Sequence, residues 1–209
     1  MDYAAAIERD ASAVFELCGR DLARPIKPCA EWKASDLRQH ILDTFEGAFE
    51  GYFPAEVEPG QAVARAVELA RVQTTAARDV AHECSIHRWD AAVSFDLEHE
   101  IEPELAWDMP PAFFTSAWPM LLDYLKRPAG AGETLRLERT DGLGRWVVRL
   151  DDRPLVSTED LPGDVTVRGT PSDLALWVWG RMDPPEVHGD RSVLEGIKNP
   201  QCPFLSPGF

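Results

Sequence analysis

Apolar residues recur at helical spacing in roughly the first 130 residues and alternate with polar residues, as in strands, after that point. The helical spacing predicts one helix over Tyr3–Leu22 and a second over Ser35–Tyr52, where Ser35 is a suitable N-cap. A third helix of about thirty residues is predicted over Gln61–Phe95, a stretch that contains no Pro or Gly. A fourth, over Pro103–Tyr124, is interrupted by two adjacent prolines. Four helices predict a bundle.

The pattern of apolar and polar residues in the C-terminal part predicts a small α/β segment. Two alternating runs, Leu135–Glu138 and Trp146–Leu150, flank a turn with two glycines, which predicts a β-hairpin. Further strands are predicted at Val165–Val167 and Glu186–His188. Between them, a Thr-Pro-Ser-Asp capping sequence precedes an apolar, buried helix over Leu174–Trp179.

We therefore predict an α+β fold with two domains. A length of 209 residues lies between one and two typical domains. The change of pattern places a four-helix bundle over residues 1–128 and a small α/β domain over residues 129–209.

Charge and composition narrow the classes of function. The chain has 36 Asp and Glu against 21 Lys and Arg, a formal net charge of −15, which disfavours binding to phosphate backbones and anionic lipids. We expect no nucleic-acid or membrane partner. No apolar stretch reaches about 18 residues and no signal-peptide pattern is present, so we expect a cytoplasmic protein. The four cysteines form no C-x-x-C pair and are expected to be free thiols.

Candidate chemistry is concentrated in the predicted third helix. The segment from His82 to His87 resembles the zinc-protease motif H-E-x-x-H but has one residue too many. At about 100° per residue, His82 and His87 lie about 140° apart around a helix and cannot bind one metal ion together. Glu83 and His87, four residues apart, lie on the same face and continue its inward stripe.

On the predicted second helix, His40 lies on the apolar side, three residues after Leu37. Ionisable side chains on two inward faces need a shared partner, because an unpaired buried carboxylate is costly. A divalent metal ion bound by His40, Glu83 and His87 would be such a partner. Two alternatives stay open on spacing alone: His40 as a hydrogen-bonded core histidine, and Glu83 with His87 as an ordinary surface pair.

Several stretches together resemble the mycothiol-dependent maleylpyruvate isomerase family, which belongs to the DinB-like metal-binding bundles. The stretches are C-A-E-W-K-A-S-D-L-R-Q-H at residues 29–40, H-E-x-x-x-H-R-W-D at 82–90, V-T-V-R-G-T-x-x-D-L at 165–174, W-G-R at 179–181 and G-D at 189–190. They span both halves of the chain in the right order, which makes the resemblance more specific than any single motif.

The resemblance implies an N-terminal DinB-like four-helix domain with His40, Glu83 and His87 as ligands of a divalent metal, usually zinc. It also implies that Arg181, from the C-terminal domain, lies near the active site, where it would bind a carboxylate of the substrate or thiol. The alternative for Arg181 is an ion pair with an acidic residue. One departure is the segment between Tyr52 and Val80, which is shorter than in typical members.

Two imidazoles and one carboxylate leave a zinc ion with a vacant fourth position, the pattern of a catalytic site. A thiol bound there loses its proton and becomes a nucleophile. We therefore predict an enzyme that uses a low-molecular-weight thiol such as mycothiol for S-transfer to, or isomerisation of, a small electrophilic substrate. The alternatives are a metal enzyme that uses bound water or Lewis acidity without a thiol, such as a hydrolase or cyclase, and a non-catalytic metal-binding or ligand-carrier protein.

Overall fold

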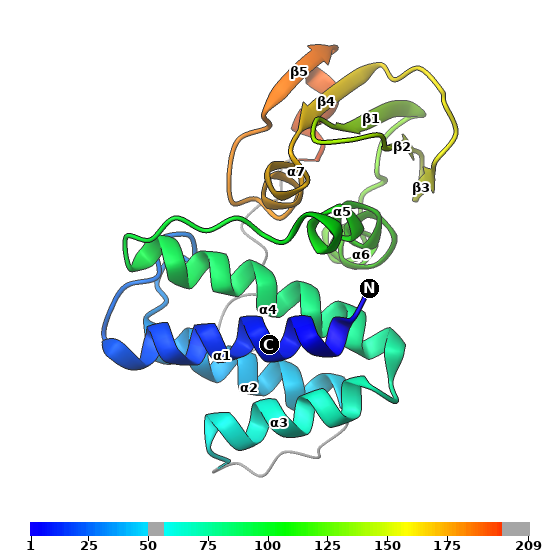
Figure 1. Cartoon of the computed structure of the whole chain (residues 1–209). Coiled ribbons are helices and arrows are strands. Elements are labelled where there is room, and N and C mark those ends of the chain that lie inside the picture. The colour runs from blue at the N-terminus through cyan, green and yellow to red at the C-terminus, as the bar shows by residue number, and fades with distance from the viewer. Residues whose placement is uncertain (50–56, 198–209) are drawn as a thin grey trace. The chain divides into compact units, whose positions relative to one another are not determined.

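The computed structural model describes residues 1–49 and 57–197. Their contacts form two compact units, Met1–Ile101 and a second that begins at Glu102. The predicted end of the second helix, near Tyr52, and the end of the C-terminal domain after residue 197 lie outside the described residues. The fold is α+β, with helices in the first unit and a mixed sheet in the second (Figure 1).

The described part of the first unit contains four helices, α1 (Tyr3–Arg20), α2 (Ala34–Ala48), α3 (Pro59–Ala70) and α4 (Thr74–Ser94). Helix α1 packs against the other three, and α2 also packs against α4. The apolar stripe predicted for α1 is its buried face: Ile7, Ala11, Val14 and Cys18 are fully buried. Burial of this stripe holds α1 against its neighbours.

The predicted third helix is two helices. Helix α3 ends at Ala70, and α4 begins at Thr74 after a turn in which Val72 is 75% exposed. At 1.5 Å per residue, one helix over this stretch would be about 50 Å long, nearly twice the length of α1. The break lets both α3 and α4 pack against α1, which an unbroken rod of that length would not do.

The second unit is built on a five-stranded sheet, in the order β3-β2-β1-β4-β5. Its strands are β1 (Glu133–Arg139), β2 (Arg145–Leu150), β3 (Pro154–Ser157), β4 (Val165–Gly169) and β5 (Glu186–Gly189). Strands β1 and β4 are parallel, and the other neighbours are antiparallel. The predicted hairpin is confirmed, with Leu137 opposite Trp146. The short strand β3, which begins with a proline, was not predicted.

The helices of the second unit are α5 (Pro103–Ala112), a π-helical turn η1 (Phe113–Ala117), α6 (Trp118–Leu125), α7 (Pro171–Val178) and α8 (Ser192–Glu195). Helix α5 begins at the predicted proline, but the two internal prolines do not end it. Instead the backbone widens into η1 just after them, where the Thr115 hydroxyl donates to the Pro111 carbonyl oxygen over 2.7 Å. This bond satisfies a carbonyl near the turn.

The segment predicted as the fourth helix of the bundle shares a core with the sheet. Phe114 and Trp118 are fully buried in one cluster with Leu135, Val148 and Val167. This hydrophobic contact explains why the segment groups with the second unit, whereas the sequence analysis placed it in a domain ending at residue 128. No helix in the described ranges is both long and apolar enough to cross a membrane.

The predicted cap of α7 offers a test of local stability. The Thr170 side chain accepts a hydrogen bond from the Asp173 backbone N–H over 3.1 Å. Thr170→Ala is expected to lower the free energy of unfolding by about 1 kcal/mol, because it leaves a helix N–H without its partner. Urea denaturation would measure the loss, and Thr170→Ser, which keeps the hydroxyl, should retain most of the stability. Equal stability of the Ala and Ser variants would contradict the capping role.

Candidate metal centre

The structure brings His40, Glu83 and His87 together inside the first unit. Helix α4 carries Glu83 and His87 one turn apart on the same face, as the spacing predicted. Helix α2 brings His40 to them because Leu37 and Ile41, on either side of it, are fully buried anchors. One ligand atom from each of the three residues lies within 4.8 Å of the other two.

The distances between these atoms suit a shared ion. The Glu83 Oε2 atom lies 3.5 Å from His40 Nε2 and 3.4 Å from His87 Nε2. Zinc bonds of 2.0–2.1 Å at tetrahedral angles separate neighbouring ligand atoms by about 3.4 Å. The carboxylate oxygen therefore lies at ligand spacing from both imidazole nitrogens, and all three atoms lie within 4.8 Å of one another.

Both Nε2 atoms are also buried without a hydrogen-bond partner. A buried polar atom with no partner is costly, and a metal ion would remove the cost at both nitrogens together. The His87 side chain is fully buried, whereas those of His40 and Glu83 are 22% and 24% exposed. The two imidazoles and the carboxylate fit zinc or another divalent ion.

The charges around the centre favour a cation. Burial alone would raise the pKa of Glu83, but the imidazoles of His40 and His87 bring it well below its usual range, so Glu83 is ionised. Burial lowers the pKa of His87, but Asp90, Cys29 and Glu83 together raise it well above its usual value. The carboxylates that stabilise positive charge on the His87 imidazole, Asp90 and Glu83, would also stabilise a cation beside it.

The segment before α2 covers the centre. Trp32 is 4% exposed, and its ring lies 5.0 Å from that of His40 and 5.8 Å from that of His87, centroid to centroid. The His87 ring is stacked on the indole at 24°, and the His40 ring is tilted to it at 53°. The indole therefore restrains both imidazoles and excludes water from that side.

Two residues that the sequence analysis gave no role lie behind His87. The His87 Nδ1 atom is 2.9 Å from Asp90 Oδ2, and the Cys29 thiol donates to the same oxygen over 3.4 Å. Both Asp90 and Cys29 are buried. The i,i+3 spacing of His87 and Asp90 was a signal that the two side chains share a face, but no pattern indicated that Cys29 would join them.

The structure places Arg181 in the second unit, just after α7. Its Nη1 donates to the Trp179 carbonyl oxygen over 2.9 Å. The role of Arg181 in binding a carboxylate stays a prediction.

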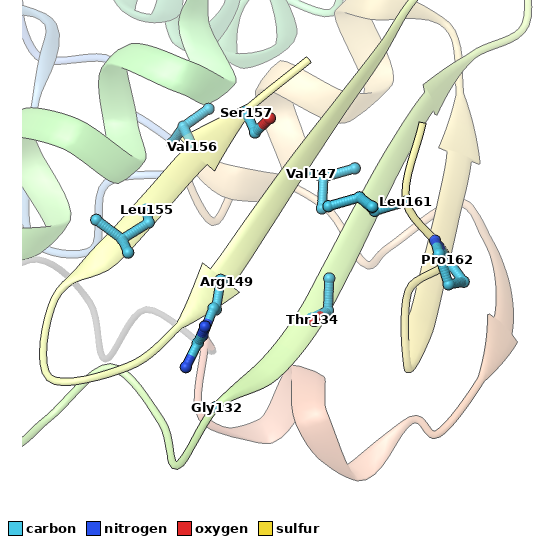
Figure 2. Close-up of a pocket in the computed structure, with 9 residues that line it drawn as sticks. All are labelled: Gly132, Thr134, Val147, Arg149, Leu155, Val156, Ser157, Leu161 and Pro162. Atoms are coloured by element: carbon cyan, nitrogen blue, oxygen red, sulfur yellow. The ribbon is translucent and has the colours of Figure 1, made fainter. Parts of the chain in front are cut away.

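The second unit also has a hollow of about 490 Å³, shown in Figure 2. It is lined by side chains of β1, β2 and β3 and of the segment that follows β3. Its nine lining residues include Arg149 but no His, Cys, Asp or Glu. This hollow therefore offers no set of metal ligands.

Residues 108–196 match the family described as the MDMPI C-terminal domain. This part of the chain is therefore similar to the C-terminal domain of maleylpyruvate isomerases. The match supports the resemblance identified from the sequence, and because it begins at Asp108, inside α5, it includes η1 and α6 as well as the sheet. Neither the curated proteins nor the solved structures contain a match to the chain. The family match lies in the second unit, and the possible metal-ligand group of His40, Glu83 and His87 lies in the first.

Proposed function

We propose that this protein is a metal-dependent enzyme of the maleylpyruvate isomerase family that uses a low-molecular-weight thiol such as mycothiol. The thiol would add to a small electrophilic substrate and then leave, which gives isomerisation, or stay, which gives S-transfer. In this proposal the N-terminal helices form a DinB-like bundle whose ligands for zinc are His40, Glu83 and His87. The observation that carries the proposal is the pair of buried, unpartnered Nε2 atoms at ligand spacing from one carboxylate oxygen.

The donor set supports a catalytic rather than a structural site. His40 and His87 are neutral donors when they bind a metal, and Glu83 supplies one negative charge. Three protein ligands leave the fourth position of a tetrahedral ion for an exogenous ligand. A zinc ion bound there would lower the pKa of an incoming thiol, so that the thiol reacts as thiolate at neutral pH.

The other residues of the proposed active site act by positioning. Trp32 shields one side of the ligands from water, which strengthens electrostatic interactions at the centre. Arg181 is proposed to bind a carboxylate of the substrate or of the thiol through two parallel hydrogen bonds from its guanidinium group.

Cobalt substitution tests the proposal without knowledge of the substrate. The Co²⁺-loaded protein is expected to show a tetrahedral visible spectrum, and addition of mycothiol should produce sulfur-to-cobalt charge-transfer absorption. An alcohol analogue of mycothiol, with oxygen in place of sulfur, is the matched control and should produce no such absorption.

Two other results would overturn parts of the proposal. Metal binding with no response to mycothiol would exclude the thiol and favour a hydrolase, a cyclase or a carrier. Failure to bind either Zn²⁺ or Co²⁺ would exclude the metal centre itself.

A further inference from the structure

His87 belongs to two groups of potential metal ligands, one through each ring nitrogen. The first is His40, Glu83 and His87, and the second is Cys29, His87 and Asp90. One imidazole can serve as a metal ligand through one nitrogen while the other nitrogen donates a hydrogen bond. The contacts of each group show which nitrogen has which role.

The two groups differ in their hydrogen bonds. The Nε2 atoms of the first group are buried with no hydrogen-bond partner. In the second group, His87 Nδ1 and the Cys29 thiol both lie at hydrogen-bonding distance from Asp90 Oδ2, at 2.9 and 3.4 Å. An ionised carboxylate only accepts, so both neighbours donate to it. The second group is therefore satisfied without an ion, and the first is not.

We propose that Asp90 and Cys29 are positioning residues that prepare His87 to bind the metal. Asp90 holds the proton on Nδ1, which leaves the Nε2 lone pair directed at Glu83 and His40. Cys29 holds the Asp90 carboxylate in place by donating to the oxygen that His87 uses. This inference rests on the proposed metal centre and assigns to Cys29 a role other than ligation.

The backbone around Cys29 supports a fixed position for its thiol. The Cys29 N–H donates to the Ile26 carbonyl oxygen over 3.0 Å, and the Trp32 N–H donates to the Cys29 carbonyl oxygen over 3.0 Å. Between them, Glu31 has a left-handed φ of 73°, a strained conformation for a residue with a Cβ. The same tight turn therefore places the thiol against Asp90 and the Trp32 indole against His40 and His87.

Burial makes the chain of contacts effective. The side chains of His87 and Asp90 are both 0% exposed, so water does not compete for the bond between them. A carboxylate that accepts from a ligand imidazole raises the basicity of that imidazole and fixes its orientation. Loss of such a partner typically lowers metal affinity by about 10–100-fold.

The test is the Zn²⁺ affinity of the folded full-length chain, measured by competition with a chelator. Asp90→Ala is expected to bind Zn²⁺ about 10–100-fold more weakly than the wild type. Cys29→Ala should lose about 2–10-fold, the worth of one hydrogen bond, and Cys29→Ser should recover most of that loss because the hydroxyl also donates. Cys18→Ala, which removes a buried thiol on α1, is the matched control and should bind as the wild type does.

Each other result has a distinct meaning. If Asp90→Ala and Cys29→Ala are folded by circular dichroism and bind Zn²⁺ as tightly as the wild type, the two residues are only structural and the inference is wrong. If the Co²⁺ protein shows sulfur-to-cobalt absorption with no thiol added, and Cys29→Ser abolishes it, Cys29 is a ligand and the inference is again wrong. If the wild type binds no metal, the proposed function fails first and the inference fails with it.

Discussion

Replacing His87 with alanine is expected to reduce Zn²⁺ affinity by more than about 100-fold. Loss of a residue that only positions a ligand already costs about 10–100-fold, and loss of the ligand itself removes a bond to the metal. The other possible ligand group, Cys29, His87 and Asp90, also contains His87, so the substitution removes a ligand from both groups. The His87 side chain is fully buried. Isothermal titration of the metal-free protein with Zn²⁺ would measure the change.

Thermal unfolding measures the loss of zinc binding in the same variant by a second method. Zinc at about 100 times its Kd should raise the free energy of unfolding of the wild type by about 2.7 kcal/mol, because it binds only the folded chain. His87→Ala and His40→Ala should lose this stabilisation at the same concentration.

The matched control is His82→Ala, on the same helix. The His82 ring meets the ring of Tyr3 edge-on, with 6.4 Å between centroids, and belongs to neither group of potential ligands. His82→Ala should therefore keep its Zn²⁺ affinity within about twofold, although the loss of a buried side chain lowers its stability. Retention of tight zinc binding by His87→Ala, or its loss in His82→Ala, would contradict the assignment of the centre.

Most of the secondary structure could be predicted because local patterns determine it. The apolar stripe of α1, the proline at the start of α5, the hairpin of β1 and β2, and the cap of α7 are all local signals, and the structure confirms them. The differences arose where tertiary packing decides. Nothing in the sequence between Ala70 and Thr74 breaks a helix by propensity, and the turn there exists because α3 and α4 both pack on α1.

The grouping of α5, η1 and α6 also depends on packing. Their apolar residues have the same helical spacing as those of α1 to α4, so periodicity alone could not assign them to one unit or the other. The aromatic residues Phe114 and Trp118 fill the space against Leu135 and Val167 in the sheet, and this contact is not visible in the sequence.

The grouping of His40, Glu83 and His87 could be predicted from the sequence, whereas the contacts of Cys29 and Asp90 with one another could not. Spacing places Glu83 and His87 on one face, and the family resemblance adds His40, so the three residues could be named together. Cys29 and Asp90 stand 61 residues apart and meet only after the turn before α2 folds against α4. A cysteine with no partner at ligand spacing gives no sign of such a contact.

Asp10, like Asp90, is a buried carboxylate that was not predicted from the sequence. We expect its replacement to have a large effect on stability. Its side chain is 2% exposed, and Oδ1 accepts from Arg88 Nη1 over 2.7 Å, which links α1 to α4. Arg9 and the Ser85 hydroxyl also donate to the carboxylate. Asp10→Ala should lower the free energy of unfolding by about 2 kcal/mol, because it removes the acceptor of the buried Ser85 hydroxyl and of the Arg88 side chain, which is 26% exposed. Urea denaturation at pH 7 would measure the loss.

The pH dependence of that loss identifies the charge as its cause. Burial raises the pKa of Asp10, but the donated bonds and the charge of Arg9 bring it below its ordinary value of 3.8. The stabilisation by the ionised form is therefore complete above about pH 5 and is lost as the pH falls through the ordinary pKa of 3.8 to the lower folded-state pKa. The difference in unfolding free energy between the wild type and Asp10→Asn, which keeps the volume but not the charge, should shrink between pH 5 and about pH 2.

The matched control is Glu8→Gln, which removes the charge of an exposed carboxylate on the same helix. It should change the free energy of unfolding by less than about 0.5 kcal/mol. A constant difference between the wild type and Asp10→Asn over this pH range would mean that packing, rather than the charge of Asp10, holds α1 to α4.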